Sequence, residues 1–230
     1  MKSTSRPVKK KQRGLSSIPA TYWLIGIVAV MVALALIVLV GLPAAATQRA
    51  KATGNTLGDA NAPVTMEVYA DFQCPVCGQF DRTTLKQIED KYVNAGKVKI
   101  IFNHFAFIGA QENGDKSESI RAAEASECAN AQGKFWEYAD TLFNNQAGEN
   151  QGAFSDANLE KFAQQVGLDM NQYKTCMQNN TYLSKVQTST QNGSARGVNA
   201  TPTIFINDHM AQGAISLAQF ESIAGTALRQ

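Results

Sequence analysis

Histidine and cysteine are scarce in this chain: of its 230 residues, two are His and four are Cys. A structural zinc site needs four ligands, usually supplied by paired motifs at matched spacing. The sequence has one C-x-x-C motif, and its histidines, His104 and His209, stand far apart. We therefore expect no metal site, and the cysteines need another explanation.

Acidic residues are absent from the first 58 positions, which hold eight Lys or Arg. The remaining residues hold thirteen Lys or Arg and all 19 Asp or Glu, a net charge of −6. A protein that binds a nucleic-acid duplex usually presents a basic surface, so this balance argues against nucleic acid as a partner. The hydrophobic content of 44% predicts one folded domain with an appendage and excludes a chain disordered throughout.

A run of 21 residues without any charge extends from Tyr22 to Leu42. A helix of this length spans about 31 Å, which matches the roughly 30 Å hydrocarbon core of a bilayer. Six Lys or Arg precede the run and only two follow it before residue 58, which places the N-terminus in the cytoplasm. We predict a basic cytoplasmic segment at 1–21 and a transmembrane signal anchor at 22–42, with the rest of the chain outside the cytoplasm at the cell membrane.

A cleaved signal peptide is the alternative, because Ala44-Ala45-Ala46 resembles a signal-peptidase site. The apolar run is longer than the core of most signal peptides, which favours an uncleaved anchor. Residues 43–58 are rich in Ala, Thr, Gly and Asn and have no periodicity, so we predict a flexible linker there. Both interpretations export the domain at 59–230.

Hydrophobic periodicity predicts an α/β domain over residues 59–230. Runs of β-branched and aromatic residues predict strands at 64–69, 98–102, 203–206 and 209–212. Apolar residues at helical spacing predict helices at 75–94, 117–131, 134–144, 155–166, 169–178, 182–195 and 216–228. This order is that of an α/β domain with a helical insertion at about 115–195.

The C-x-x-C motif, Cys74-Pro75-Val76-Cys77, falls where the first predicted strand gives way to a helix. Proline suits the first helical turn because its missing N–H would have no partner there. Cys74 would then lie at a helix N-terminus, where free N–H groups and the helix dipole favour a thiolate. The pattern predicts Cys74 as a nucleophile and Cys77 as the resolving thiol one turn away.

Structural roles for the cysteines stay open, since exported proteins meet an oxidising compartment. A purely structural bridge between Cys74 and Cys77 would close a very small loop and stabilise the fold little. Cys128 and Cys176 both lie in predicted helices, and a bridge between them would contribute about 4 kcal/mol in the chain-entropy account. We interpret Cys128 and Cys176 as a structural pair, although four cysteines allow three pairings.

Several motifs resemble, in the same order, the DsbA-like branch of the thioredoxin superfamily. They are L-G-D-A-N-A-P-V-T at 57–65, D-F-Q-C-P-V-C at 71–77, F-W-E-Y at 135–138, L-F at 142–143, G-L-D at 167–169 and G-V-N-A-T-P-T at 197–203. The resemblance covers roughly residues 57–228, and the order of the motifs makes it far more specific than a lone C-x-x-C.

This resemblance implies a thioredoxin fold with an inserted α-helical subdomain, and thiol–disulfide exchange as the activity. It implies that Cys74 attacks, that Cys77 resolves, and that a cis Pro202 faces them, with Thr201 offering backbone groups to a substrate. The Cys128–Cys176 pair is similar to a second, structural disulfide of some members. No organic cofactor and no metal are implied.

Two positions depart from the family pattern. Many relatives have a buried acid six residues before the first cysteine, where this chain has Val68 with Glu67 as its neighbour. Because a one-residue offset on a strand turns the side chain to the other face, Glu67 does not simply inherit that role. Ala200 also replaces the glycine that often precedes Thr-Pro in the family.

We interpret the chain as a membrane-tethered thiol–disulfide oxidoreductase that introduces disulfides into unfolded or reduced exported proteins. By family analogy its reoxidant is a quinone-linked membrane protein of the DsbB or vitamin-K-epoxide-reductase kind. Two alternatives stay open: a disulfide reductase or isomerase that uses the same cysteines, and a non-catalytic thioredoxin-fold binding or chaperone module.

Overall fold

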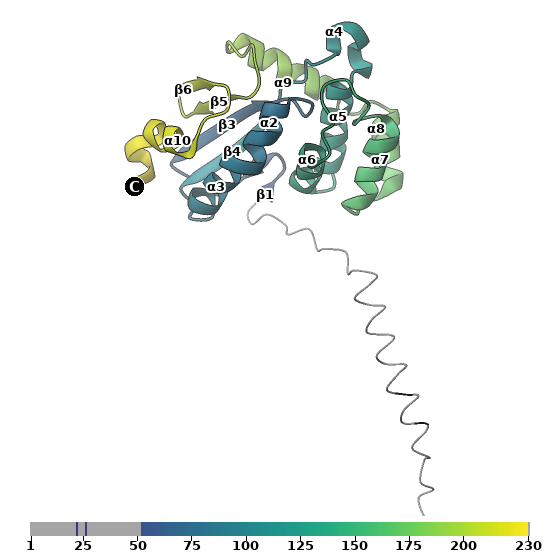
Figure 1. The fold of residues 1–230 in the computed structure, drawn as a ribbon, viewed down its shortest axis with the longest axis horizontal. Helices are drawn as coiled ribbons and strands as arrows, with labels where there is room; N and C mark the ends of the chain where they lie inside the picture. The colour runs from purple at the N-terminus through teal and green to yellow at the C-terminus, as the bar shows by residue number, and fades with distance from the viewer. Residues whose placement is uncertain (1–21, 23–25, 27–51, 230) are drawn as a thin grey trace, which may run out of the picture. The chain divides into compact units, whose positions relative to one another are not determined.

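The structure, a computed structural model, describes Tyr22, Gly26 and residues 52–229 (Figure 1). No helix within these residues is long and apolar enough to cross a bilayer. The predicted basic segment at 1–21 lies outside the described residues, and so does the predicted membrane span at 22–42 except for Tyr22 and Gly26.

Within residues 52–229, six strands form one sheet in the order β1-β2-β4-β3-β5-β6. The strands are β1 (Ala52–Thr53), β2 (Thr56–Leu57), β3 (Val64–Ala70), β4 (Val98–His104), β5 (Thr203–Ile206) and β6 (His209–Gln212). β3 and β4 are parallel and pair from Val64 with Val98 to Ala70 with His104, whereas the other neighbours are antiparallel. The parallel pair brings the segments that follow β3 and β4 to the same edge of the sheet.

Alternation along β3 separates the two faces of the sheet. Val64, Met66 and Val68 are buried on one face, and Thr65 and Glu67 are half-buried on the other. This period of two is the expected consequence of strand geometry, in which successive side chains point to opposite faces. The main hydrophobic core therefore lies on the Val68 face.

Helices on the Val68 face position the cysteine motif (Figure 1). They are α2 (Pro75–Phe80) and α3 (Lys86–Ile88), π-helical turns at Asp81–Leu85 and Glu89–Val93, and α10 (Leu217–Ala224). Leu85, Ile88 and Phe220 are buried in the same core as the strands. The predicted helix at 75–94 is thus one continuous run of helical turns.

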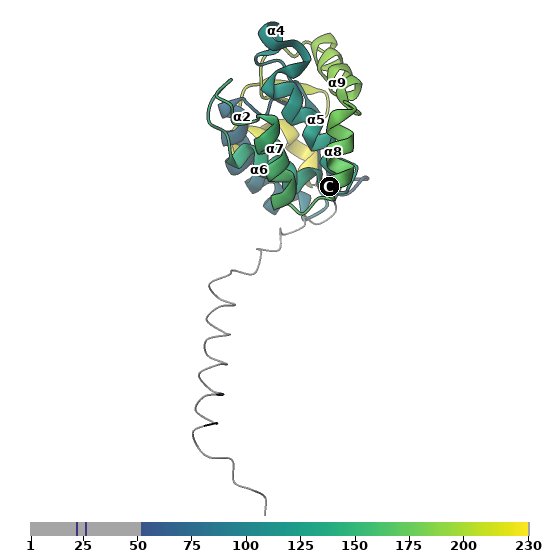
Figure 2. The ribbon, with the colours of Figure 1, turned by 90° about the vertical axis from the view of Figure 1, so that its right-hand side faces the viewer.

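The helical insertion packs beside the sheet as a bundle (Figure 2). Its helices are α4 (Ala110–Asn113), α5 (Glu118–Asn130), α6 (Phe135–Asn144), α7 (Asp156–Gln165), α8 (Met170–Gln178) and α9 (Leu183–Ala195). Phe135, Tyr138 and Phe143 of α6 are buried in the main core, so the insertion and the sheet share one core. α9 reaches the other face, where a Cβ on Gly193 would lie 2.9 Å from the rings of Tyr69 and Phe105.

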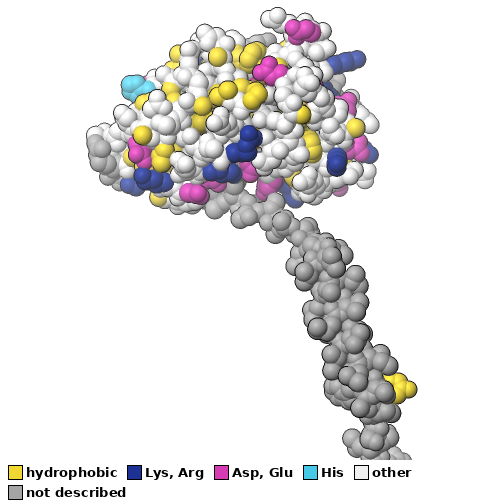
Figure 3. Space-filling view, in the orientation of Figure 1, with side chains coloured by type: hydrophobic (Ala, Val, Ile, Leu, Met, Phe, Trp, Pro, Cys, Tyr) yellow, Lys and Arg dark blue, Asp and Glu magenta, His cyan; other side chains and the backbone are white. Residues whose placement is uncertain are grey.

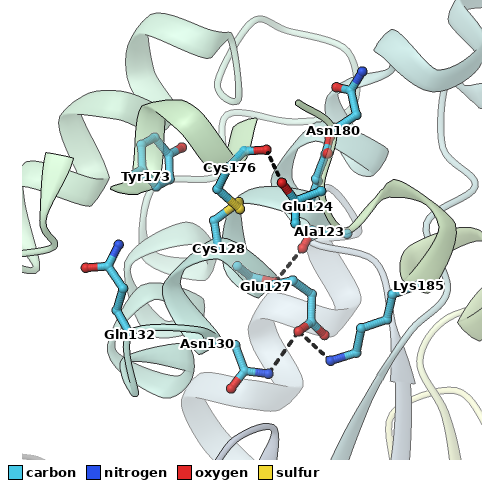
Figure 4. The surroundings of a disulfide bond; sticks show 12 residues. Ala123, Glu124, Glu127, Cys128, Asn130, Gln132, Tyr173, Cys176, Asn180 and Lys185 are labelled. Carbon is cyan, nitrogen blue, oxygen red and sulfur yellow. Dashed lines mark hydrogen bonds and ion pairs between the residues drawn. A yellow bond between two sulfur atoms is a disulfide. The ribbon is translucent and has the colours of Figure 1, made fainter. Parts of the chain in front are cut away.

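A disulfide joins Cys128 of α5 to Cys176 of α8, with 6.0 Å between their Cα atoms (Figure 4). Cys128 is 1% exposed and packs in the main core. The bridge joins α5 to α8 through two cysteines that are 48 residues apart in sequence.

The prediction of a flexible linker through residue 58 is wrong for its last residues. β1 and β2 form a short hairpin, and Leu57 pairs with Ile100 of β4 and is fully buried. Strands of two residues are too short to show periodicity, and the pairing partner is more than 40 residues away in sequence. The short helix α4 was likewise not predicted.

Candidate active site

Cys74 lies at the point where β3 has ended and α2 begins. Its backbone is extended (φ −67°, ψ 115°), and Pro75 occupies the first turn of the helix. The Cys74 N–H donates to the Asp71 carbonyl at 3.1 Å, and its own carbonyl accepts from the Gly78 N–H at 3.2 Å. The sulfur is therefore held at a helix N-terminus, where backbone N–H groups have no helical partner.

Hydrogen bonds lower the pKa of the Cys74 thiol from 9.0 to about 6. The largest contribution is a hydrogen bond from the Cys77 thiol, and burial opposes it. The Thr201 side chain and the backbone N–H groups of Val76 and Cys77 lower the pKa further. A pKa of about 6 favours the thiolate form of Cys74 at neutral pH, although the residue is only 6% exposed.

The Cys77 thiol behaves in the opposite way. Burial raises its pKa well above the ordinary value, and the neighbouring Cys74 sulfur raises it further. Both cysteines are free thiols in the structure. The motif thus holds one ionised and one protonated sulfur, which is the division of labour that a nucleophile and a resolving thiol need.

The loop before β5 faces the motif. The peptide bond between Thr201 and Pro202 is cis, and the Thr201 carbonyl lies 3.4 Å from the Cys74 sulfur. The Cys74 thiol donates to this carbonyl when it is protonated, and this hydrogen bond is lost when the sulfur ionises. With Ala200 in place of glycine, the loop still forms a hydrogen bond from the Thr203 hydroxyl to the Ala200 carbonyl at 2.7 Å.

Glu67 and Val68 lie on opposite faces of β3, as alternation requires. Val68 is buried in the main core, whereas Glu67 accepts from the Arg196 guanidinium at 2.7 and 3.1 Å. Arg196 also stacks on Phe205, 4.0 Å from its ring centroid. Glu67 therefore fixes the start of the Thr201 loop rather than facing the main core.

Asp71 is a site residue that the sequence did not single out. Its carboxylate is 1% exposed and accepts four hydrogen bonds, from the N–H groups of Gln73 (2.9 Å), Phe107 (3.0 Å) and Ile108 (3.1 Å) and from the Ser119 hydroxyl (2.5 Å). Burial raises the pKa of this carboxyl group and the hydrogen bonds oppose the rise. Three segments of the chain meet at this one side chain.

The insertion also contacts the backbone of the cysteine motif. The Gln146 amide donates to the carbonyls of Phe72 (2.7 Å) and Cys74 (2.9 Å). The Asn150 N–H donates to the Gln73 side chain at 2.6 Å. These contacts join residues more than 70 positions apart, and the sequence has no periodicity or motif that would reveal them.

The two histidines lie apart in the structure. His104 is buried, and its Nε2 lies 3.0 Å from Glu127 Oε1. Burial raises the pKa of Glu127, but hydrogen bonds from His104, Lys185 and Asn130 hold it at about 2. His209 lies exposed on β6. His104 and Glu127 thus connect β4 to α5.

The chain matches the thioredoxin family over residues 50–224. Among solved structures, BdbD of Bacillus subtilis in its oxidised form superimposes with a TM-score of 0.69 and 24% identity, over 80% of this chain and 97% of that one. α-DsbA1 of Wolbachia pipientis gives a TM-score of 0.66 and 23% identity, over 76% and 90%. At these identities the structures establish the fold: a thioredoxin-like α/β fold with a helical insertion.

The chain also resembles curated proteins of two different kinds. The probable disulfide bond formation protein D of Bacillus cereus is 27% identical over 70% of this chain and 74% of the relative. The Na⁺/H⁺ antiporter NhaA 1 of Salinispora arenicola is 29% identical over 75% of this chain, but the match spans only 25% of the antiporter. Nothing about ion transport follows for this chain from a match to a quarter of that protein.

Proposed function

Because this chain belongs to the thioredoxin family and is a DsbA-like thiol–disulfide oxidoreductase, we propose that it introduces disulfide bonds into exported proteins. The observation that carries the proposal is the position of Cys74 at the N-cap of α2, beside the buried Cys77 and 3.4 Å from the Thr201 carbonyl, which lowers the pKa of Cys74 while burial raises that of Cys77. The name of the Bacillus cereus relative, a probable disulfide bond formation protein, supports the same direction.

The first step opens the Cys74–Cys77 disulfide of the oxidised enzyme. A client thiolate attacks the Cys74 sulfur, the bond between Cys74 and Cys77 breaks, and Cys77 leaves as a thiolate. Its raised pKa then favours uptake of a proton from solvent. The product is a mixed disulfide between Cys74 and the client.

The second step releases the client. A second client thiolate attacks the client sulfur of the mixed disulfide, and Cys74 leaves as a thiolate. A thiol with a lower pKa leaves faster, so the Cys74 pKa of about 6 favours this step at neutral pH. The client loses two electrons and two protons, and the enzyme keeps the electrons as its reduced pair.

The cellular setting is part of the proposal. The chain would be anchored by residues 22–42, with its domain outside the cytoplasm and a quinone-linked membrane protein as its reoxidant. The uncharged run and the basic residues before it support the membrane anchor. A reoxidant is needed because each turnover leaves two electrons on the enzyme. A reporter that works only outside the cytoplasm should be active when it is fused after Gln230. The full-length protein should stay with the membrane fraction after alkaline extraction. Recovery of a soluble form that begins near Thr47 would show cleavage instead.

A direct assay of the catalytic direction uses the oxidised protein and a reduced peptide with two cysteines. We expect one peptide disulfide to form for each Cys74–Cys77 pair that is reduced. Mass spectrometry measures both products. Efficient reduction of insulin with little peptide oxidation would favour the reductase. Efficient repair of scrambled ribonuclease would favour the isomerase. Client binding that survives Cys74→Ser with full function in cells would favour the binding module.

A further inference from the structure

Arg196 caps the end of α9, directly before the loop at 197–202 that faces the cysteine motif. Its guanidinium donates to both carboxylate oxygens of Glu67, from Nη1 at 2.7 Å and from Nη2 at 3.1 Å. Nη1 also donates to the Tyr69 hydroxyl at 2.9 Å, and Cζ lies 4.0 Å from the centroid of the Phe205 ring. One side chain thus joins the end of α9 to β3 and β5.

This contact differs from an ordinary surface ion pair. Exposed pairs usually contribute little, because holding two long side chains in one geometry costs entropy. Here two N–H groups of one fork bond to one carboxylate, and stacking on Phe205 fixes the plane of the guanidinium as well. Asn103 of β4 also donates to Glu67, at 3.2 Å, so the carboxylate is itself held in place.

The ion pair lies on the face of the sheet opposite the main core. Glu67 and Phe205 are direct partners across β3 and β5, so their side chains share one face. Helix α2 covers the other face, and hydrophobic side chains gather around it in the space-filling view (Figure 3). Any effect of Arg196 on the two sulfurs must therefore pass through the chain that connects the two faces.

The loop at 197–202 is that connection. Val198 is buried in a small cluster with Tyr69, so the first turn of the loop packs on a side chain that Arg196 also contacts. At the other end of the loop, Thr203 pairs with Tyr69 across the sheet. Both ends of the loop are thus held at one residue of β3.

Between these ends, the loop places Thr201 against the cysteine motif. The Thr201 carbonyl lies 3.4 Å from the Cys74 sulfur. The Thr201 side chain lowers the pKa of both Cys74 and Cys77. The other donors to the Cys74 sulfur belong to α2, so a shift of the loop would change the Thr201 contacts alone.

We propose that Arg196 is a positioning residue for thiol–disulfide exchange: paired with Glu67, it holds the loop so that Thr201 meets the two sulfurs of the cysteine motif. Without the pair, the thiolate loses a donor, and the Cys74–Cys77 couple shifts toward the disulfide. The proposal concerns the exchange chemistry itself and goes beyond the proposed function, because it holds for either direction of electron flow.

The first test measures the Cys74 thiolate in reduced Arg196→Gln, which lacks the fork and the charge. A neutral hydrogen bond corresponds to about fivefold in an equilibrium constant, and a displaced loop loses part of it. We expect the thiolate absorbance step to rise by about half a pH unit and the equilibrium constant for reduction by glutathione to fall about threefold. Lys174→Gln is the matched control: it breaks the 2.7 Å ion pair with Glu160, far from the loop in sequence, and should change neither quantity.

A double variant tests the route of the effect. Thr201→Val removes the hydroxyl at similar volume and should raise the Cys74 pKa at least as much as Arg196→Gln. Because Arg196 acts through Thr201, adding Arg196→Gln to Thr201→Val should produce no further rise. Glu67→Leu should match Arg196→Gln, and the two changes together should exceed neither one.

Arg196→Lys separates positioning from a purely structural role. Lysine keeps the charge but not the planar fork, so this variant should show a smaller rise of the Cys74 pKa in the same direction. It also provides the measurement should Arg196→Gln not fold. A lower free energy of unfolding with an unchanged Cys74 pKa in the folded variants would make Arg196 structural only and overturn the proposal.

Two further results would overturn the proposal while the proposed function stands. One is additive pKa shifts of Arg196→Gln and Thr201→Val, and the other is an equal shift in Lys174→Gln. Failure of wild type to oxidise the reduced dithiol peptide would instead overturn the proposed function, and the pKa measurements on the reduced protein would still decide the role of Arg196.

Discussion

Three of the four cysteines are buried, Cys176 is partly buried, and the two pairs have opposite surroundings. Cys74, Cys77 and Cys128 are all at most 6% exposed. Cys74 occupies the N-cap of α2, with backbone N–H groups and a thiol directed at its sulfur, whereas Cys128 and Cys176 lie within α5 and α8. Inside a helix the N–H groups are taken by carbonyls one turn away.

The difference teaches that burial alone does not make a cysteine inert. A position at a helix start supplies unpaired donors that stabilise a thiolate, and a position inside a helix does not. The reactive pair and the bridge that joins α5 to α8 therefore follow from where each cysteine falls in its helix. The predictions below test this division.

The largest expected effect is on activity. Cys74→Ser should lower peptide oxidation by about 10³-fold or more, because no other group supplies the exchanging sulfur. Replacing Cys128 and Cys176 together by Ser should leave the rate at 25 °C within twofold. The measurement is the rate of peptide oxidation without added dithiothreitol, detected by mass spectrometry. If the variant without Cys128 and Cys176 also loses thiol–disulfide exchange, the two cysteine pairs do not have separate functions.

The next effect is on stability. Replacing Cys128 and Cys176 together by Ala should lower the free energy of unfolding by about 4 kcal/mol, because the bridge spans 48 residues of chain. Urea unfolding followed by circular dichroism measures this. A matched control is wild type with only the Cys74–Cys77 pair reduced, which should retain the stability that the Cys128–Cys176 bridge provides. A loss below 1 kcal/mol would show that the bridge does not stabilise the bundle.

The third effect is the pH dependence of the Cys74 thiolate. Its folded-state pKa of about 6 lies below the ordinary 9.0, so the stabilisation of the reduced folded form is full near pH 9 and is lost as pH falls through 6. At pH 7 it amounts to about 1.4 kcal/mol, which raises the reduction potential by about 30 mV. From about −270 mV for thioredoxin, we expect about −240 mV, a moderate oxidant that depends on its reoxidant.

Thiolate absorbance at 240 nm across pH, and equilibration with glutathione, measure both quantities. The absorbance step should be centred near pH 6 and absent in Cys74→Ser. A step above pH 8, or a potential more negative than that of thioredoxin, contradicts the oxidase direction and favours the reductase.

The smallest effect concerns the contact from the insertion. Gln146→Ala removes the donors to the Phe72 and Cys74 carbonyls, and a neutral hydrogen bond contributes about 1 kcal/mol. We expect a loss of about threefold to fivefold in the exchange rate. Gln151→Ala, which removes an exposed amide that bonds only to the nearby Glu149 carbonyl, is the control. Equal rates for the two variants would show that Gln146 does not affect the motif.

The sequence predicted the elements with strong local patterns. Helices α5 to α9 of the insertion begin and end within a residue or so of their predicted limits because their apolar spacing is regular, and the Ser216–Gln219 capping box starts α10 as expected. The short β1–β2 hairpin was not predicted, because the pairing of β2 with β4 is set by tertiary contact rather than by local propensity.

The candidate site was only half accessible from sequence. Cys74, Cys77, Thr201 and Pro202 stood in motifs, and the structure brings Cys74, Cys77 and Thr201 together. Asp71 stood in the same motif, but its partners Phe107 and Ser119 come from segments whose meeting depends on the parallel register of β3 and β4 and on the packing of α5. Such meetings leave no trace in local sequence.

Gly78 connects these observations to protein engineering. Alanine in place of glycine inside a helix usually stabilises it by about 1 kcal/mol. Here the added Cβ would overlap Gln146 Oε1, so the amide that holds the Phe72 and Cys74 carbonyls would be displaced. The usual gain is therefore offset by the loss of the two hydrogen bonds from Gln146, which contribute about 1 kcal/mol each, and the same change would slow the enzyme. Alanine at position 78 becomes useful only when position 146 is redesigned with it.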